Sequence, residues 1–331
     1  MTDPNKPDSS PKTPLIQRSH LPRIEFRKSQ RRDLTFYLAA EFAAVLSWLV
    51  RLTPDGMVDF IARRIGDLSY FRSKQWRSNV ESNLSHVLDL PSDSARIHRT
   101  ARTVFQTNAL NVASLLRSPH QGGNELLRHL VLTNCGWDVL DKAMARHQGV
   151  IILTAHLGSF DTMGNALRIR GYPMAALTTR TTNRFAFEFV SFLRQSHNLE
   201  LIEASSSGVR EAISHLRAGK MLCLLSDRDF FLNGREIEFF GERTTLPIGA
   251  VRMARETGAS IVPVFTVRQG RKHALMIEPA FTVDKTNDRN ADIALGMERV
   301  VGTLENAIAM APDQWVMFQR VWPEDTERSI R

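Results

Sequence analysis

The sequence contains very little cysteine. Cys135 and Cys223 are the only cysteines among its 331 residues. Two cysteines are too few for a disulfide framework, and neither has the spacing of a metal-ligand pair. The simplest interpretation is a protein of a reducing compartment that holds no metal ion. A chain of this length can bury a substantial core, as one large domain or as two modest ones.

Several catalytic motifs are also absent. The sequence has no Gly-x-Ser-x-Gly turn for a nucleophilic serine, no P-loop, no dinucleotide-binding glycine pattern and no His-Glu-x-x-His zinc motif. Cys223 lies in the middle of a short apolar run, where a structural role is favoured over a nucleophilic one. These absences disfavour a covalent intermediate on the protein, and we expect no cofactor.

Acidic residues are outnumbered, 35 against 43 Lys and Arg, which gives a net charge of +8. Such a charge indicates an anionic partner: nucleic acid, a membrane surface or a phosphorylated substrate. Nucleic acid is disfavoured because no recognised binding motif is present and acids stand between the basic residues. Residues 1–33 hold eight of the Lys and Arg and five of the fourteen prolines. We expect this tail to be disordered.

An apolar stretch follows the tail, from Leu34 to Val50, with Glu41 as its single charge. Its length is at the short limit for a bilayer span of about 20 residues, and it lacks the cleavage pattern of a signal peptide. Three alternatives remain: a helix lying in the membrane interface, a single span, or a buried core helix. The aromatic residues in the stretch and its basic N-terminal flank favour the interfacial helix. That flank comprises Arg27, Lys28, Arg31 and Arg32.

Short apolar runs alternate with helix-like segments in the second half of the chain. Strands are expected at residues 150–154, 174–179, 199–202, 221–226, 260–267 and 274–279, and helices at 159–170, 185–197, 205–219, 247–258 and 291–311. The alternation is typical of an α/β fold with a mixed, largely parallel central sheet flanked by helices. We therefore expect a disordered tail at 1–33, a helical membrane-associating region at 34–130 and an α/β core at 131–331.

His156 is the histidine whose position in this pattern is most informative. Four of the ten histidines have an acid five residues later, at positions 20, 120, 156 and 273, but only His156 lies where an expected buried strand ends and a helix begins. Ligands of open α/β sheets bind at the carboxyl ends of strands. Gly158 gives the turn room, Ser159 suits an N-cap, and Asp161 falls in the first turn of the helix. We expect Asp161 to fold back onto one ring nitrogen of His156; the alternative is a capping aspartate beside a solvated histidine.

A neutral histidine held by a carboxylate can act as a general base near pH 7. Its target is either a serine of the protein or a hydroxyl of the substrate. Because the sequence has no serine motif, direct action on a bound alcohol is favoured.

The stretch HLGSFD, from His156 to Asp161, resembles the His-x4-Asp/Glu motif of glycerophospholipid-type acyltransferases. The closer likeness is to the bacterial branch that acylates glycolipids, namely lipid A lauroyl/myristoyl acyltransferases and phosphatidylinositol mannoside acyltransferases. The resemblance runs from about residue 35 to the end and includes QWVMFQRVWPED at 314–325. Residues 226–265, which begin SDRDFFLNGREIEFFGE, carry it more specifically than the histidine motif does. Their DRD to FFGE stretch is nearer the phosphatidylinositol mannoside enzymes.

The resemblance implies that His156 deprotonates a sugar hydroxyl of a membrane glycolipid, which then attacks the thioester of an acyl-CoA or an acyl carrier protein. Asp161 would orient and stabilise the imidazolium. Asp227 would be a second carboxylate near the histidine, although a salt bridge with Arg228 is the alternative for it. Backbone N–H groups around residues 160 and 161 would stabilise the oxyanion.

Three arginines are candidate substrate-binding residues: Arg180, Arg194 and Arg228. Guanidinium groups suit the phosphates of a lipid head or of coenzyme A; otherwise each is an ordinary surface or loop arginine. The resemblance also implies a place at the cytoplasmic face of the bacterial plasma membrane. A thioesterase or lipid hydrolase that uses the same histidine and aspartate is the main alternative function.

Overall fold

The protein is described here by a computed structural model. It describes residues 34–121, 125, 128–131, 135–179, 183–195, 199–230 and 234–322, which all belong to one compact unit. The basic tail at 1–33, for which the sequence predicts disorder, lies outside the described residues.

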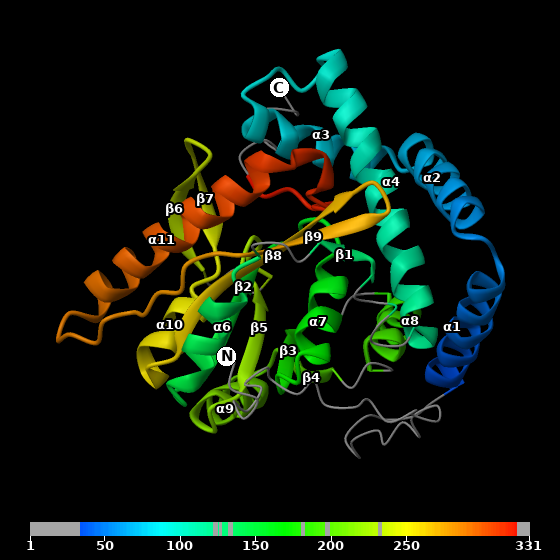
Figure 1. Ribbon diagram of the computed structural model, residues 1–331. Coiled ribbons are helices and arrows are strands. Elements are labelled where there is room, and N and C mark those ends of the chain that lie inside the picture. The colour runs from blue at the N-terminus through cyan, green and yellow to red at the C-terminus, as the bar shows by residue number, and fades with distance from the viewer. Residues whose placement is uncertain are drawn as a thin grey trace, which may run out of the picture. The chain divides into compact units, whose positions relative to one another are not determined.

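A seven-stranded sheet forms the centre of this unit (Figure 1). In spatial order its strands are β1 (Leu130–Val131), β9 (Lys272–Ile277), β8 (Ser260–Gln269), β2 (Val150–Thr154), β5 (Met221–Leu225), β3 (Met174–Thr178) and β4 (Glu200–Glu203). Only the β8–β9 pair is antiparallel. The expected mixed, largely parallel α/β fold is therefore confirmed, and the strands predicted from the sequence end within two residues of those observed.

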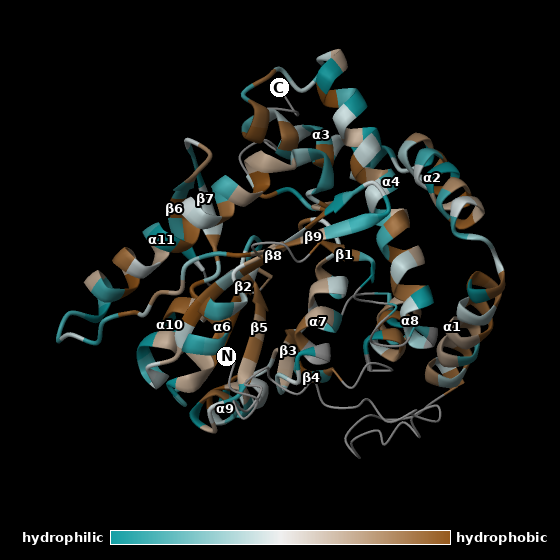
Figure 2. Ribbon diagram, in the orientation of Figure 1, coloured by the Kyte–Doolittle hydropathy of each residue, from teal (hydrophilic) through white to brown (hydrophobic). Residues whose placement is uncertain are grey.

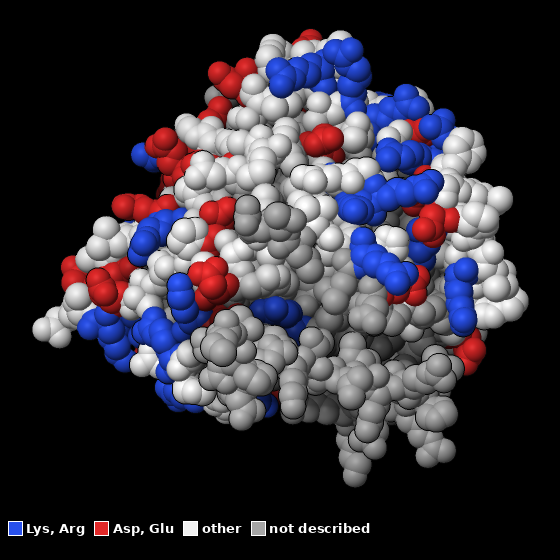
Figure 3. Space-filling model, viewed as in Figure 1, with Lys and Arg blue, Asp and Glu red and all other residues white. Residues whose placement is uncertain are grey.

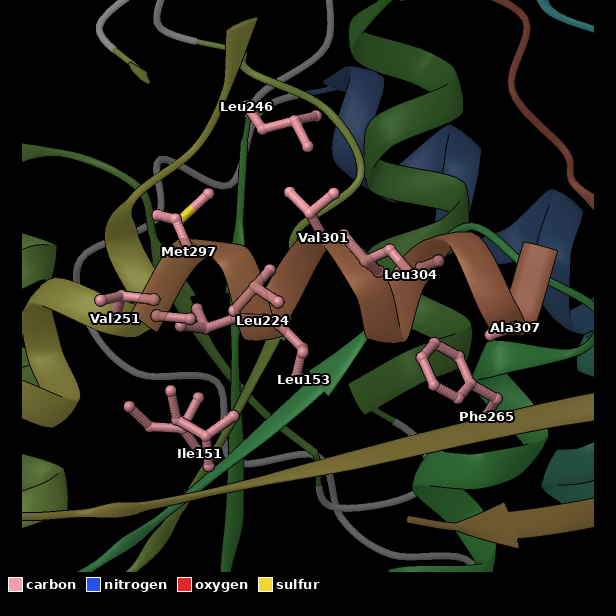
Figure 4. Packing of buried hydrophobic residues seen from close by; sticks show 14 of the residues in the cluster. Ile151, Leu153, Leu224, Leu246, Val251, Phe265, Met297, Val301, Leu304 and Ala307 are labelled. Atoms are coloured by element: carbon pink, nitrogen blue, oxygen red, sulfur yellow. The ribbon is translucent and has the colours of Figure 1, made fainter. Parts of the chain in front are cut away.

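The central strand β2 divides the core because its side chains alternate between the two faces of the sheet. Ile151 and Leu153 pack into one cluster, with α10 (Gly249–Thr257) and α11 (Arg289–Met310) above them (Figure 4). Val150 and Ile152 pack into a second cluster on the opposite face. That cluster is closed by α6 (Trp137–Ala145) and α7 (Phe160–Ile169). Each of these fully buried side chains contributes about 1.5–3 kcal/mol through removal from water, so β2 is held rigidly on both faces.

Two further helices flank the strands at the β4 side of the sheet. They are α8 (Arg184–Gln195) and α9 (Ser206–Arg217). The α9 helix begins at a cap in which the Ser205 hydroxyl accepts from the backbone N–H of Gly208. This bond satisfies one of the free donors at a helix start.

The described part of the N-terminal region includes four long helices: α1 (Leu34–Leu52), α2 (Asp55–Arg72), α3 (Lys74–Leu88) and α4 (Ala95–Arg117). The α4 helix packs against the other three (Figure 1). The Ser94 hydroxyl caps α4 by accepting from the N–H of Ile97 at 3.3 Å. α1 uses one narrow face to contact α8 and α4, through Phe36, Ala39, Ala43 and Ser47.

A β-hairpin formed by β6 (Arg235–Phe239) and β7 (Glu242–Leu246) was not predicted. Its turn residues, Phe240 and Gly241, both have positive φ angles, 51° and 75°, as a two-residue hairpin turn requires. The hairpin is fixed to α11 by a hydrogen bond from the Phe240 N–H to the Glu305 carboxylate, at 2.6 Å.

Candidate active site

His156 lies in the loop that leads from the end of β2 to the start of α7. Gly158 makes this path possible because its φ of 54° lies in the left-handed region, and a Cβ there would approach the carbonyl oxygen of Thr266 to 1.8 Å. The side-chain amide of Asn111, on α4, donates to the carbonyl of Gly158 at 2.6 Å. The loop is therefore fixed by β8 on one side and by α4 on the other.

Asp227 is the carboxylate that contacts the histidine ring. It follows β5, the parallel neighbour of β2, where Thr154 and Leu225 are register partners. Residues two positions beyond each strand are thus adjacent. Oδ1 of Asp227 accepts from Nδ1 of His156 at 2.9 Å, and Oδ2 accepts from the backbone N–H of the same histidine at 2.8 Å.

The environment of Asp227 keeps it ionised. Its side chain is 0% exposed, and this burial by itself raises the pKa. Electrostatic attraction and hydrogen bonds from His156, together with a hydrogen bond from the indole of Trp315, outweigh that effect and lower the pKa below its usual value. An ionised carboxylate only accepts hydrogen bonds, so Nδ1 of His156 carries the proton.

The other ring nitrogen of His156, Nε2, is then the basic one. The histidine side chain is 23% exposed, so the ring is neither sealed in the core nor free in solvent. Two aromatic rings flank it: Phe160 at 5.7 Å between centroids, edge-on, and Phe230 at 6.3 Å. The site therefore combines an anchored imidazole with apolar walls, which suits removal of a proton from a bound alcohol.

The expectation that Asp161 contacts the ring of His156 is wrong. The Asp161 carboxylate instead accepts from Nε and Nη2 of Arg194, at 2.7 and 3.4 Å. The reason is geometric: Asp161 lies in the first turn of α7, which faces the last turn of α8, whereas the parallel strand pair places Asp227 beside the ring. Ser159, the expected N-cap, precedes α7 and its hydroxyl is bonded to that of Thr162 at 2.8 Å.

The three candidate arginines differ in their surroundings. Burial lowers the pKa of Arg194, but the charge and hydrogen bonds of Asp161 outweigh it, and the net shift is upward. Arg228 lies 4.0 Å from the centroid of the Phe230 ring, and burial lowers its pKa against the attraction of Asp227. Arg228 is thus a partly desolvated cation close to the His156–Asp227 pair. Arg180 lies outside the described residues.

Trp315 and Asn111 are site residues that sequence analysis missed. The indole Nε1–H of Trp315 donates to Oδ2 of Asp227 at 2.9 Å. Trp315 lies in the segment that resembles the family's C-terminal end, but no local pattern connects it with His156. Asn111 sits within a helix and has no sequence signal that distinguishes it from other polar helix residues.

Other chemistry in this region is limited. Burial raises the pKa of the Cys223 thiol, in β5, to about 12, which suits a structural residue. Among the residues that the structure describes, no group of three or more His, Cys, Asp or Glu side chains could hold a metal ion.

Comparison with known proteins shows what the chain as a whole is similar to. The family model described as "Bacterial lipid A biosynthesis acyltransferase" matches residues 25–324. Phosphatidylinositol mannoside acyltransferase of Mycobacterium tuberculosis (strain ATCC 25618 / H37Rv) is 27% identical over 315 residues, covering 93% of this chain and 96% of that protein. The protein of the same name from Mycolicibacterium smegmatis is 24% identical over 84% of this chain and 89% of its own length. A lipid A biosynthesis acyltransferase of Haemophilus influenzae is 24% identical over 65% of this chain and 66% of its own length.

Proposed function

Because this chain belongs to the bacterial lipid A biosynthesis acyltransferase family and is thereby an acyltransferase, we propose that it acylates a hydroxyl of a membrane glycolipid with His156 as the general base. The acceptor is of the lipid A or phosphatidylinositol mannoside type, and the donor is an acyl-CoA or an acyl carrier protein. The observation that carries this proposal is the contact between His156 Nδ1 and the ionised Asp227, which leaves Nε2 free to take a proton.

The proposed reaction is a direct transfer. Nε2 of His156 removes the proton of the sugar hydroxyl as its oxygen attacks the thioester carbonyl carbon. The tetrahedral intermediate then collapses, the carbon–sulfur bond breaks, and the imidazolium returns the proton to the departing thiolate. The products are an ester and a free thiol, and no atom of the protein is acylated.

Asp227 stabilises the imidazolium that forms during this reaction, because it is charged, buried and bonded to Nδ1. The oxyanion of the intermediate is stabilised by the backbone N–H groups of Phe160 and Asp161. These groups stand in the first turn of α7, where N–H groups have no acceptor within the helix. Asp161 acts by holding Arg194, which fixes the position of this turn.

The substrate phosphates are proposed to bind the arginines near the site. Arg228 is the strongest candidate because it is partly desolvated, its guanidinium lies over the Phe230 ring, and it is attracted by the charge of Asp227. A phosphate would supply the charge-assisted hydrogen bonds that such a cation favours. Arg180 and Arg194 are further candidates, although the guanidinium of Arg194 already donates a hydrogen bond to Asp161.

Attachment to the membrane is proposed to use an apolar surface on α1 and α2. By length and composition, α1 is the one described helix that could cross a bilayer. Only 22% of its apolar window is buried, which argues against a core helix, and its packing on α8 argues against a lone span. An interfacial helix, with one face on the protein and the other on lipid, is supported best.

The α2 helix extends this apolar surface. Both helices expose large apolar side chains. Their ribbons contain brown, hydrophobic residues, and the two helices lie on the same side of the molecule (Figure 2). Basic side chains (Lys and Arg, blue) are frequent over the region of α2 and α4 (Figure 3), where they suit anionic lipid heads. We define the α1–α2 apolar surface as Leu34, Tyr37, Leu38, Phe42, Val45, Trp48, Leu49, Leu52, Met57, Phe60, Ile61, Ile65, Leu68 and Phe71. The proposed location is the cytoplasmic face of the bacterial plasma membrane.

An acyl-transfer assay tests the proposed function. Purified full-length protein is mixed with a labelled long-chain acyl-CoA, or the same chain on acyl carrier protein, and membrane glycolipids of each type. We expect labelled acylated glycolipid with wild-type protein and none with His156→Ala. Release of free fatty acid at the same rate with and without acceptor would instead identify a thioesterase.

A further inference from the structure

The buried carboxylate of Asp227 accepts three hydrogen bonds, and within the described residues only one of the donors lies outside His156. Two come from the ring and the backbone of the histidine; the third is the indole N–H of Trp315. Without the indole, the carboxylate would be hydrogen-bonded only to His156. Its orientation would then depend on the residue whose ring it has to orient. We infer that Trp315 is a positioning residue that fixes Asp227 and, through it, the imidazole of His156. This role rests on the proposed general-base function.

Trp315 is itself fixed independently of Asp227. Its side chain is 1% exposed, and its backbone forms an antiparallel bridge with Leu157. The next residue, Val316, donates its N–H to the carbonyl of His156 at 2.7 Å. On the other side, the carboxamide of Gln314 makes two hydrogen bonds to the backbone of β8, at 2.7 and 3.0 Å. The indole therefore reaches Asp227 from a segment that is locked to the sheet.

The indole also supports the charge of Asp227. The charged groups that act on this carboxylate are His156 and Arg228; Arg194 is engaged with Asp161. Replacing the indole leaves those charges in place and removes one hydrogen bond. Asp227 then becomes easier to protonate, and a protonated Asp227 no longer supports the imidazole, so transfer should be lost first at the acidic end of the pH–rate profile.

A second tryptophan in the same aromatic cluster provides a matched control. Trp322 is also 1% exposed, and its ring lies 6.4 Å from that of Trp315. Its Nε1 has no hydrogen-bond partner within the described residues. Trp322→Phe therefore removes the same atoms from the same core as Trp315→Phe but takes no hydrogen bond from Asp227.

The test compares full-length wild type, Trp315→Phe and Trp322→Phe. Acyl transfer from a long-chain acyl-CoA is measured across pH, and the histidine N–H protons are recorded by NMR with 15N-labelled histidine. The Nδ1–H resonance of His156 is assigned by its loss in His156→Ala. In Trp315→Phe we expect kcat to fall about 10- to 100-fold with KM nearly unchanged. The acidic end of the pH–rate profile should lose more activity than the neutral region, and the Nδ1–H resonance should weaken through exchange. Trp322→Phe should retain wild-type values.

Equal effects of the two substitutions on kcat, on the pH profile and on the NMR resonance would overturn the inference. If Trp315→Phe does not fold, a variant with 3-benzothienylalanine in place of Trp315 keeps the ring and exchanges the N–H for sulfur. A wild-type profile for that variant also overturns the inference. The NMR measurement requires no turnover. Selective loss of the resonance in a protein that transfers no acyl group therefore supports the positioning role and refutes the proposed function.

Discussion

The carboxylate of Asp161 and the guanidinium of Arg194 form a two-point hydrogen bond that joins the first turn of α7 to the last turn of α8, with distances of 2.7 and 3.4 Å. Leu193, the neighbour of Arg194, packs on Ala43 of α1. The acid of the His-x4-Asp motif therefore connects the histidine loop with the helix proposed to lie on the membrane. It connects them through packing and charge, without touching the imidazole.

Double substitution should reveal this pairing. We expect Asp161→Asn and Arg194→Gln each to lower the free energy of unfolding by about 1.5–3 kcal/mol, because each leaves a partly buried charge without its partner. The double variant should lose less than the two single losses combined. Denaturant unfolding of the four proteins measures the coupling. Additive losses would show that the pair contributes nothing beyond its separate side chains.

Removal of the proposed base should abolish transfer without unfolding the protein. His156→Ala is expected to lose about 10²–10⁴-fold in turnover, the usual contribution of a positioned general base. The free energy of unfolding should fall by about 1–3 kcal/mol, because the buried Asp227 loses one of its three hydrogen bonds, so turnover is compared at equal folded concentration. His98→Ala is the matched control because His98 is half-exposed, on α4, and bonded to a carboxylate, that of Glu81. Near-normal turnover by His156→Ala would sink the mechanism.

The two carboxylates near the site should differ in their effect on catalysis. Asp227→Asn removes the charge that stabilises the imidazolium and can favour the wrong tautomer, so we expect a loss of about 10²–10⁴-fold in kcat. Asp161→Asn should retain more activity, measured at equal folded concentration, because its carboxylate bonds to Arg194. The reverse order of activities would favour the arrangement expected from the sequence, with Asp161 on the ring.

The thiol of Cys223 should be inert at physiological pH. Since burial raises its pKa to about 12, the thiol stays protonated, and thus unreactive, between pH 7 and 9. Alkylation of the folded protein by iodoacetamide should be slow throughout this range and accelerate on unfolding. Cys223→Ala should keep acyl transfer within a few-fold of wild type. Complete loss of transfer in a folded Cys223→Ala protein would point to a covalent acyl-cysteine.

Charges placed on α2 should weaken membrane binding. Phe60→Asp and Leu68→Asp introduce acids at positions of the α1–α2 apolar surface that are 62% and 59% exposed. Co-sedimentation with anionic vesicles should fall for both, and high salt should weaken the wild type without releasing it fully. Leu295→Asp is the control because Leu295 is equally exposed, 62%, on α11. A similar loss in Leu295→Asp would mean that net charge, and not this surface, governs binding.

Local features of the sequence were enough to predict the main strands and helices of the α/β core. The strand at 150–154 was predicted with its observed bounds because a short run of β-branched and apolar residues has few other stable conformations in a core. The hairpin was missed although its signal was present: the segments 235–239 and 242–246 flank Phe240 and Gly241, a two-residue turn. That signal is weak, because Gly241 suits a turn position with positive φ whereas Phe240 is an uncommon residue there.

The exposed face of α2 was not predictable from its own residues. An amphipathic helix has the same periodicity whether its apolar stripe is covered by protein or by lipid. The structure shows that α4 covers Val58 and Ala62, among others, and leaves Phe60, Leu68 and Phe71 exposed. Only the packing of neighbouring helices decides which side remains free.

The sequence by itself placed His156 at the carboxyl end of a buried strand, because apolar runs, glycine turns and helix caps act over a few neighbouring residues. The identity of the carboxylate on its ring was decided by tertiary structure. The strand order sets β5 beside β2 and so brings Asp227 to Nδ1, while Asp161, only five residues away, turns toward α8. Trp315 reaches the same carboxylate from a segment 88 residues farther along the chain. Contacts of this kind depend on which strands pair and which segments cross, and no local pattern encodes them.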